Sequence, residues 1–164
     1  MNTVRTLIIY ASKNGCTEYC ARYLKEKLGK NAVVTNVENK ISKMDDFDTI
    51  LIGSSVHMGK IQKKITSFCR LNKSQLLGKE LGLFVCCYTK EDEEGFIESL
   101  FDNELLNHAT TTSIFGGEMR YDKLNIVYRK LFESLNKVEG FREGFTEPEI
   151  KYDEIDKFAT MFTK

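Results

Sequence analysis

The chain has 164 residues, which is the length of one domain and enough to bury a hydrophobic core. Its 24 basic and 24 acidic residues balance, which argues against nucleic-acid binding and against the strongly acidic surface of a carrier protein. The five cysteines include no Cys-x-x-Cys pair, and neither a signal sequence nor a long apolar run is visible. We therefore expect a single soluble domain over residues 1–164, cytoplasmic, with reduced thiols and no nucleic-acid partner.

Short apolar runs alternate along the chain with segments of helical periodicity. Strands are predicted over residues 6–10, 31–37, 49–53, 80–87 and 110–115. Helices are predicted over residues 18–28, 60–71, 94–106 and 124–135, and from about residue 152 onward. This alternation, with a single proline in the chain, indicates an α/β domain in which helices cover both faces of an open parallel sheet. In such sheets ligands bind at the carboxyl ends of the strands, where the strand order reverses.

A polar turn joins the first predicted strand to the first helix. It reads Ser12, Lys13, Asn14, Gly15, Cys16, Thr17. Backbone N–H groups at the start of a helix lack partners and carry partial positive charge, so such a turn can bind a phosphate group. The hydroxyl groups of Ser12 and Thr17 would be further donors. The alternative is an ordinary turn in which Ser12 or Thr17 caps the helix.

This turn resembles the phosphate loop of flavodoxins, Ser/Thr-x-Thr-Gly-x-Thr, with Asn14 in place of the usual threonine. The resemblance implies a flavodoxin-like three-layer sandwich with a five-stranded parallel sheet in the order 2-1-3-4-5. It also implies FMN as the cofactor. The crevice for the flavin would then lie between the ends of the first and third strands.

Two later loops would complete the FMN site. The loop after the third strand lies against the flavin ring in flavodoxins, and here it consists of Ser54, Ser55, Val56, His57, Met58 and Gly59. Met58-Gly59 resembles the peptide that hydrogen-bonds ring nitrogen N5. After the fourth strand, Cys87 would lie close to the ring and Tyr88 would stack on its outer face.

A simpler interpretation of each of these residues stays open. The two glycine-bearing loops can be hydrophilic turns without a ligand, and His57, which has no second ligand near it in the sequence, can be merely exposed. We predict no metal site. Tyr88 can simply cover the end of its strand, and Cys86 and Cys87 can be buried strand residues, because adjacent strand residues point to opposite faces and do not easily form a disulfide.

The segment Gly117-Glu118-Met119-Arg120-Tyr121 resembles the Gly-x-Leu-Arg-Tyr motif of bacterial menaquinone-dependent protoporphyrinogen oxidases (dehydrogenases), which have a flavodoxin fold. This resemblance implies an FMN-dependent oxidoreductase of heme biosynthesis that oxidises protoporphyrinogen, reduces a quinone and contacts the inner face of the membrane. Arg120 would pair with a substrate carboxylate, a surface salt bridge being the alternative. The chain departs from this family at His57-Met58, where the family has Arg-Tyr, and at residues 91–94, which are acidic where the family has a basic loop.

A flavodoxin-type single-electron carrier, with a redox protein as its partner, is the alternative to an enzyme. Such carriers dock through an acidic face around the flavin. This chain is neutral and has Lys13 and Lys60 on the predicted flavin loops, which favours an enzyme with a small-molecule substrate. The sequence argues against a phospho-receiver of the same fold, because Ser12 and Ser54 stand where a receiver needs acidic residues.

Overall fold

A sheet of five parallel strands forms the centre of the computed structural model, which describes residues 3–41, 43–86, 95–117, 126–138 and 149–163. The strands are β1 Thr6–Ala11, β2 Ala32–Asn36, β3 Thr49–His57, β5 Glu80–Cys86 and β6 Thr111–Ile114. They pair in the order β2-β1-β3-β5-β6. Counted along the chain, this is the predicted order 2-1-3-4-5, so the predicted fold is confirmed.

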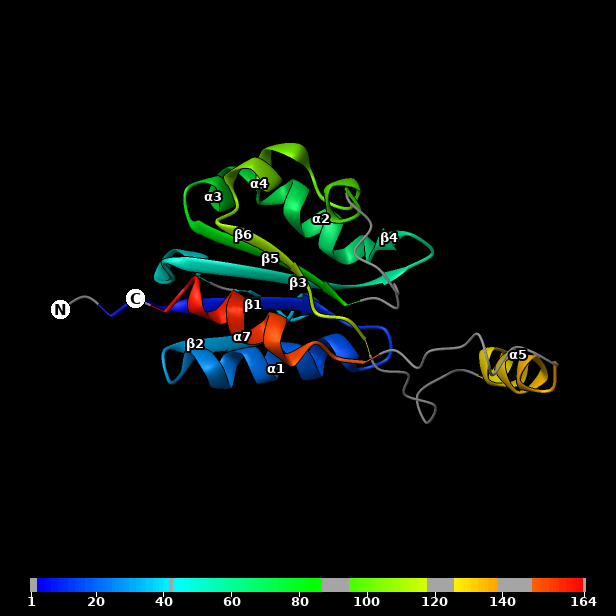
Figure 1. Ribbon diagram of the computed structural model, residues 1–164. Coiled ribbons are helices and arrows are strands. Elements are labelled where there is room, and N and C mark those ends of the chain that lie inside the picture. The colour runs from blue at the N-terminus through cyan, green and yellow to red at the C-terminus, as the bar shows by residue number, and fades with distance from the viewer. Residues whose placement is uncertain (1–2, 42, 87–94, 118–125, 139–148, 164) are drawn as a thin grey trace.

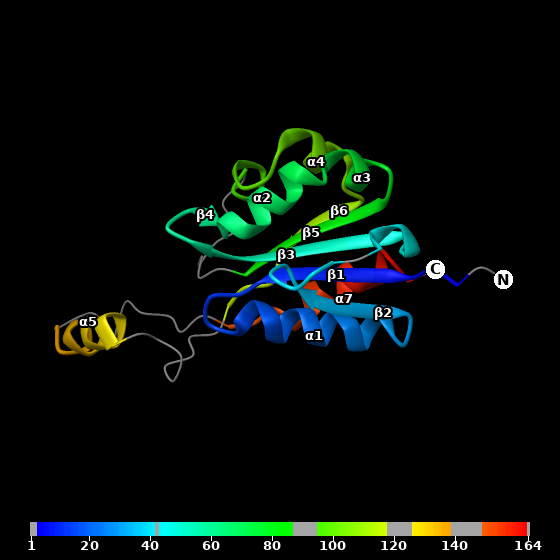
Figure 2. The same cartoon turned by 180° about the vertical axis from the view of Figure 1, so that it is seen from behind.

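Helices cover both faces of the sheet, as the two opposite views in Figures 1 and 2 show. One face carries α1 Cys16–Leu28 and α7 Tyr152–Thr160, and the other carries α2 Lys63–Leu71, α3 Lys73–Leu77 and α4 Asn103–His108. Helix α5, Ile126–Asn136, lies apart from both layers (Figure 1). Among the described residues, no helix combines the length and the apolar character that a membrane crossing requires.

The first strand shows why this sequence folds into three layers. All of its residues are buried, because both faces of the sheet are covered. Leu7 and Ile9 face the core beneath α2, α3 and α4, whereas Ile8 and Tyr10 face the core beneath α1 and α7. An apolar run without polar alternation is what a central parallel strand requires.

Residues 60–61 differ from the predicted helix. They form the short strand β4 Lys60–Ile61, which pairs antiparallel with the end of β3. The strand β3 therefore runs to His57, beyond its predicted end, and a tight turn follows it in which Met58 (φ 50°) and Gly59 (φ 73°) both have left-handed backbones. Two successive residues with positive φ make a turn whose twist suits a hairpin, so the chain turns back before α2 begins.

The backbone of Met58 is expected to cost stability. A left-handed conformation costs a residue with a Cβ atom about 1–2 kcal/mol, and the Met58 side chain is 88% exposed, so it gains little packing in return. Replacing Met58 by glycine should raise the free energy of unfolding by up to about 1 kcal/mol after the entropy cost of glycine, as measured by urea denaturation. Lys60→Gly, at an exposed strand position, should lower it by about 0.5–1 kcal/mol. Destabilisation by both variants would contradict the strain at Met58.

The predicted helix over residues 94–106 is interrupted. A 3-10 helix, η2 Ile97–Ser99, precedes α4, which begins only at Asn103. The Asp102 carboxylate accepts hydrogen bonds from the backbone N–H groups of Glu104 and Leu105, so it caps a new helix and ends the preceding turn. In this segment Ile97 and Phe101 are buried, whereas Phe96 and Leu100 are partly buried against the same core.

Candidate functional site

Three strands bring their carboxyl ends to one edge of the sheet. In the register of the sheet, Ala11 of β1 lies opposite Ser54 of β3, and Ser54 lies opposite Val85 of β5. The polar residues that follow these positions must therefore meet at the same edge. The strand order reverses between β1 and β3. An open α/β sheet binds its ligands at this point, outside the carboxyl ends of the strands.

The first loop leaves the start of α1 open to an anion. Gly15 precedes the helix with a left-handed backbone (φ 85°), and no side chain caps the helix. The Ser12 hydroxyl instead accepts a hydrogen bond from the Gly15 N–H (3.0 Å), which closes the loop and still leaves the hydroxyl proton available to a ligand. The alternative, an ordinary turn in which Ser12 or Thr17 caps the helix, is therefore not observed. The positive end of the helix faces this loop.

Thr17 has an unsatisfied hydroxyl group at the same place. The side chain is fully buried in the first turn of α1. Its Oγ1 atom is the single buried side-chain oxygen or nitrogen without a hydrogen-bond partner among the described residues. A buried hydroxyl without a partner costs about 1–3 kcal/mol, so its presence beside an uncapped helix end indicates that a ligand completes the site.

A pocket at this edge brings the first and second loops together. Its lining includes, from the predicted site residues, Ser12, Lys13, Asn14, Cys16, Thr17, Ser55, Val56 and His57. Two further residues line it that we had not assigned to the cofactor: Cys86, at the end of β5, and Gly117, in the loop after β6. The position of Cys86 explains the first, because its side chain packs in the core cluster beneath α1. For Gly117, the signal in the sequence was the pair of glycines at positions 116 and 117, shortly after the last predicted strand.

Ser54 supports the second loop from within. It is fully buried, its hydroxyl donates to the carbonyl of Ser55 (2.9 Å), and it accepts from the backbone N–H of Gln62 (2.9 Å). The Gln62 side-chain amide in turn donates to the Ser55 hydroxyl (2.8 Å). Gln62, which the sequence analysis did not single out, therefore ties the hairpin to the start of α2. Met58 and Gly59 form the tip of this hairpin and are not among the residues that line the pocket.

Several predicted site residues lie outside the described residues. They are Cys87, Tyr88 and Arg120, together with the acidic segment 91–94 and residues 118–121 of the motif quoted above. Their roles stay predictions.

The comparisons with known proteins agree with this geometry. A family model described as a flavodoxin domain matches residues 7–144, which is most of the chain. The chain belongs to the flavodoxin domain family. No curated protein matches its sequence.

Solved structures share the fold of this flavodoxin domain at low sequence identity. A WrbA-like flavodoxin from Agrobacterium tumefaciens is 15% identical with a TM-score of 0.55, and the match covers 98% of this chain and 92% of that one. A flavoprotein in complex with FMN from Lactobacillus acidophilus NCFM is 16% identical (TM-score 0.54; 68% and 93% covered). Rubredoxin oxygen:oxidoreductase from Desulfovibrio gigas is 17% identical (TM-score 0.53), and the match covers 80% of this chain but 34% of that protein. This chain therefore spans about a third of the oxidoreductase's length.

Proposed function

We propose that this flavodoxin domain binds one FMN at the edge where β1, β3 and β5 end, and that it acts in electron transfer as an oxidoreductase. The observation that carries the proposal is the buried Thr17 hydroxyl without a partner, beside the uncapped start of α1. A phosphate ester supplies the acceptor oxygens that both features lack. Family membership and the complex of the Lactobacillus acidophilus flavoprotein with FMN support the choice of a flavin mononucleotide.

Different residues of the site would contact the phosphate and the ring of the cofactor. The backbone N–H groups of the first turn of α1 and the hydroxyls of Ser12 and Thr17 would hold the phosphate. Ser55, Val56 and His57 line the adjoining part of the pocket and would lie against the ring. The bound flavin would supply the electron-transfer chemistry, while the protein orients it and controls its surroundings.

The preference for a phosphate gives the test of this proposal. The flavin-free protein should bind FMN at least about a hundredfold more tightly than riboflavin, since two hydrogen bonds to a charged phosphate contribute roughly 3–6 kcal/mol. Quenching of flavin fluorescence measures both affinities, and the visible spectrum of the purified protein shows whether flavin is retained. Equal affinity for riboflavin, or a preference for FAD, would contradict the proposed site.

The reaction that we propose is the oxidation of an organic substrate, protoporphyrinogen by resemblance, with a quinone as acceptor. It is supported by the motif that contains Arg120 and by the lysines on the two loops, of which Lys13 lines the pocket. Quinone reduction would require contact with the membrane surface. In anaerobic mixing, protoporphyrinogen should bleach the FMN of the loaded protein and a menaquinone analogue should restore it.

A single-electron carrier is the second candidate, because the family match is to the flavodoxin domain itself. In that case protoporphyrinogen should leave the FMN oxidised, whereas a flavodoxin reductase should reduce it rapidly. The same stopped-flow measurement therefore separates the two functions.

A further inference from the structure

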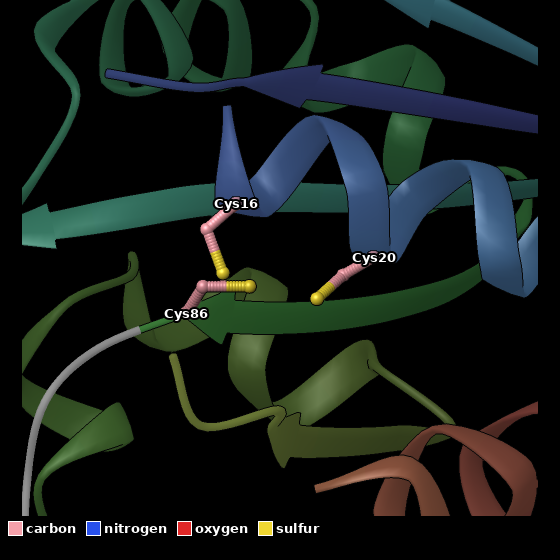
Figure 3. Close-up of side chains that lie close together, drawn as sticks. All are labelled: Cys16, Cys20 and Cys86. Carbon is pink, nitrogen blue, oxygen red and sulfur yellow. The ribbon is translucent and has the colours of Figure 1, made fainter. Parts of the chain in front are cut away.

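Three cysteine side chains converge beneath the first loop. Cys16 and Cys20 lie one turn apart on α1, and Cys86 comes from the end of β5. The three Sγ atoms all lie within 4.8 Å of one another, and Figure 3 shows the thiols pointing toward a common point. The sequence alone suggested a buried strand residue for Cys86 and no role for Cys20. The signal in the sequence for Cys20 was its distance of four residues from Cys16, which puts both cysteines on one face of a helix.

The surroundings of these thiols are apolar and closed. Cys20 is fully buried, and Cys86 and Cys16 are 4% and 8% exposed. They pack in the core cluster that contains Leu24 and Phe84, and no carboxylate or imidazole belongs to the group within the described part of the chain. Hydrogen bonding to Cys16 and Cys20, together with burial, raises the pKa of the Cys86 thiol well above its usual value. The cluster thus offers three soft sulfur donors in a closed, apolar environment.

In contrast to the prediction from the sequence that there is no metal site, we propose that Cys16, Cys20 and Cys86 form a binding site for one cuprous ion, Cu⁺. Thiolate sulfur is the ligand that soft ions such as Cu⁺ prefer. Metal–sulfur bonds of about 2.3 Å hold three sulfur atoms roughly 4 Å apart around a three-coordinate ion, so the observed separations need only a small contraction. Zinc, by contrast, almost always takes four ligands in closed sites, and this group offers three among the described residues.

Binding replaces S–H bonds by Cu–S bonds without any change of oxidation state. Each thiol that coordinates gives its proton to the solvent, and copper stays monovalent throughout. The bound site carries negative charge, which the positive end of α1 beside Cys16 partly offsets.

The test is an anaerobic titration of the full chain with Cu⁺ against a chromophoric cuprous chelator. The site consists of protein sulfur alone, so it does not rest on the proposed FMN binding, and the titration is carried out on both flavin-loaded and flavin-free protein. We expect one copper ion per chain with three sulfur neighbours by X-ray absorption spectroscopy. Cys20→Ala should weaken the affinity at least about a hundredfold, because a third of the ligand set is lost.

Cys69 provides a matched control. It is also a buried thiol, but it lies on α2 in the opposite core cluster, and burial raises its pKa to about 12. Cys69→Ala should keep the copper affinity of the unaltered protein. Circular dichroism checks that Cys20→Ala folds, and Cys20→Ser replaces it if it does not. Loss of all copper to the chelator, fewer than three sulfur neighbours, or equal losses in Cys69→Ala and Cys20→Ala would overturn the proposal.

Discussion

Replacing Thr17 by valine is expected to stabilise the flavin-free protein and to weaken its binding of FMN. Valine has nearly the same shape but no hydroxyl, so it removes the buried Oγ1 that has no partner. The free energy of unfolding of the flavin-free protein should rise by about 1–3 kcal/mol in urea denaturation. Loss of a hydrogen bond to a charged phosphate costs about 1.5–3 kcal/mol, so the affinity for FMN in a fluorescence titration should fall tenfold or more.

Two companion variants separate this explanation from others. Thr17→Ser keeps the hydroxyl and should retain most of the affinity for FMN. Lys13→Ala removes a cation that lines the pocket, but it should weaken binding less than Thr17→Val, since the turn and the helix end hold the phosphate. A much larger loss in Lys13→Ala would contradict a site built on the helix end. If the flavin-free Thr17→Val protein is less stable than the unaltered flavin-free protein, the Thr17 hydroxyl is not an unsatisfied group.

The sheet could be predicted from the sequence because its signals are local. Five short runs of strand character alternate with helices, and this pattern leaves few topologies for an α/β domain. The loop from Ser12 to Thr17 could be assigned for the same reason, since a strand, a polar turn and a helix follow one another directly. The order of strands then placed the second loop beside the first.

The parts that could not be predicted depend on contacts between distant residues or on backbone geometry. The hairpin of β3 and β4 needs Met58 in a left-handed conformation, and a methionine in the sequence does not indicate such a conformation. The break before α4 depends on whether Asp102 caps a helix or lies within one. The cysteine cluster requires that the end of β5 pack against α1, so Cys86 joins Cys16 and Cys20 only through tertiary structure.

Adding a single methyl group at Gly53 is expected to be among the most destabilising changes in this protein. Gly53 lies in β3 directly before Ser54, and a Cβ atom there would overlap ring atoms Cε2 and Cζ of Phe84. That ring cannot move aside easily, because it is fully buried, stacks on Phe115 (centroids 4.5 Å apart) and meets the edge of Phe158 (5.7 Å). Gly53→Ala should lower the free energy of unfolding by about 3 kcal/mol in urea denaturation.

Gly78→Ala is the control, since Gly78 has a negative φ (−88°) and the nearest atom to its added Cβ lies at an ordinary 3.4 Å, so its stability should change little. The double variant Gly53→Ala/Phe84→Leu tests the cause. A smaller side chain at position 84 leaves room for the methyl group, so the two substitutions together should cost less stability than the sum of their separate costs. The difference should be about 1 kcal/mol or more, which is within the range of interaction energies between residues in contact. Additive costs would mean that the overlap with Phe84 is not what makes glycine necessary at position 53 of β3.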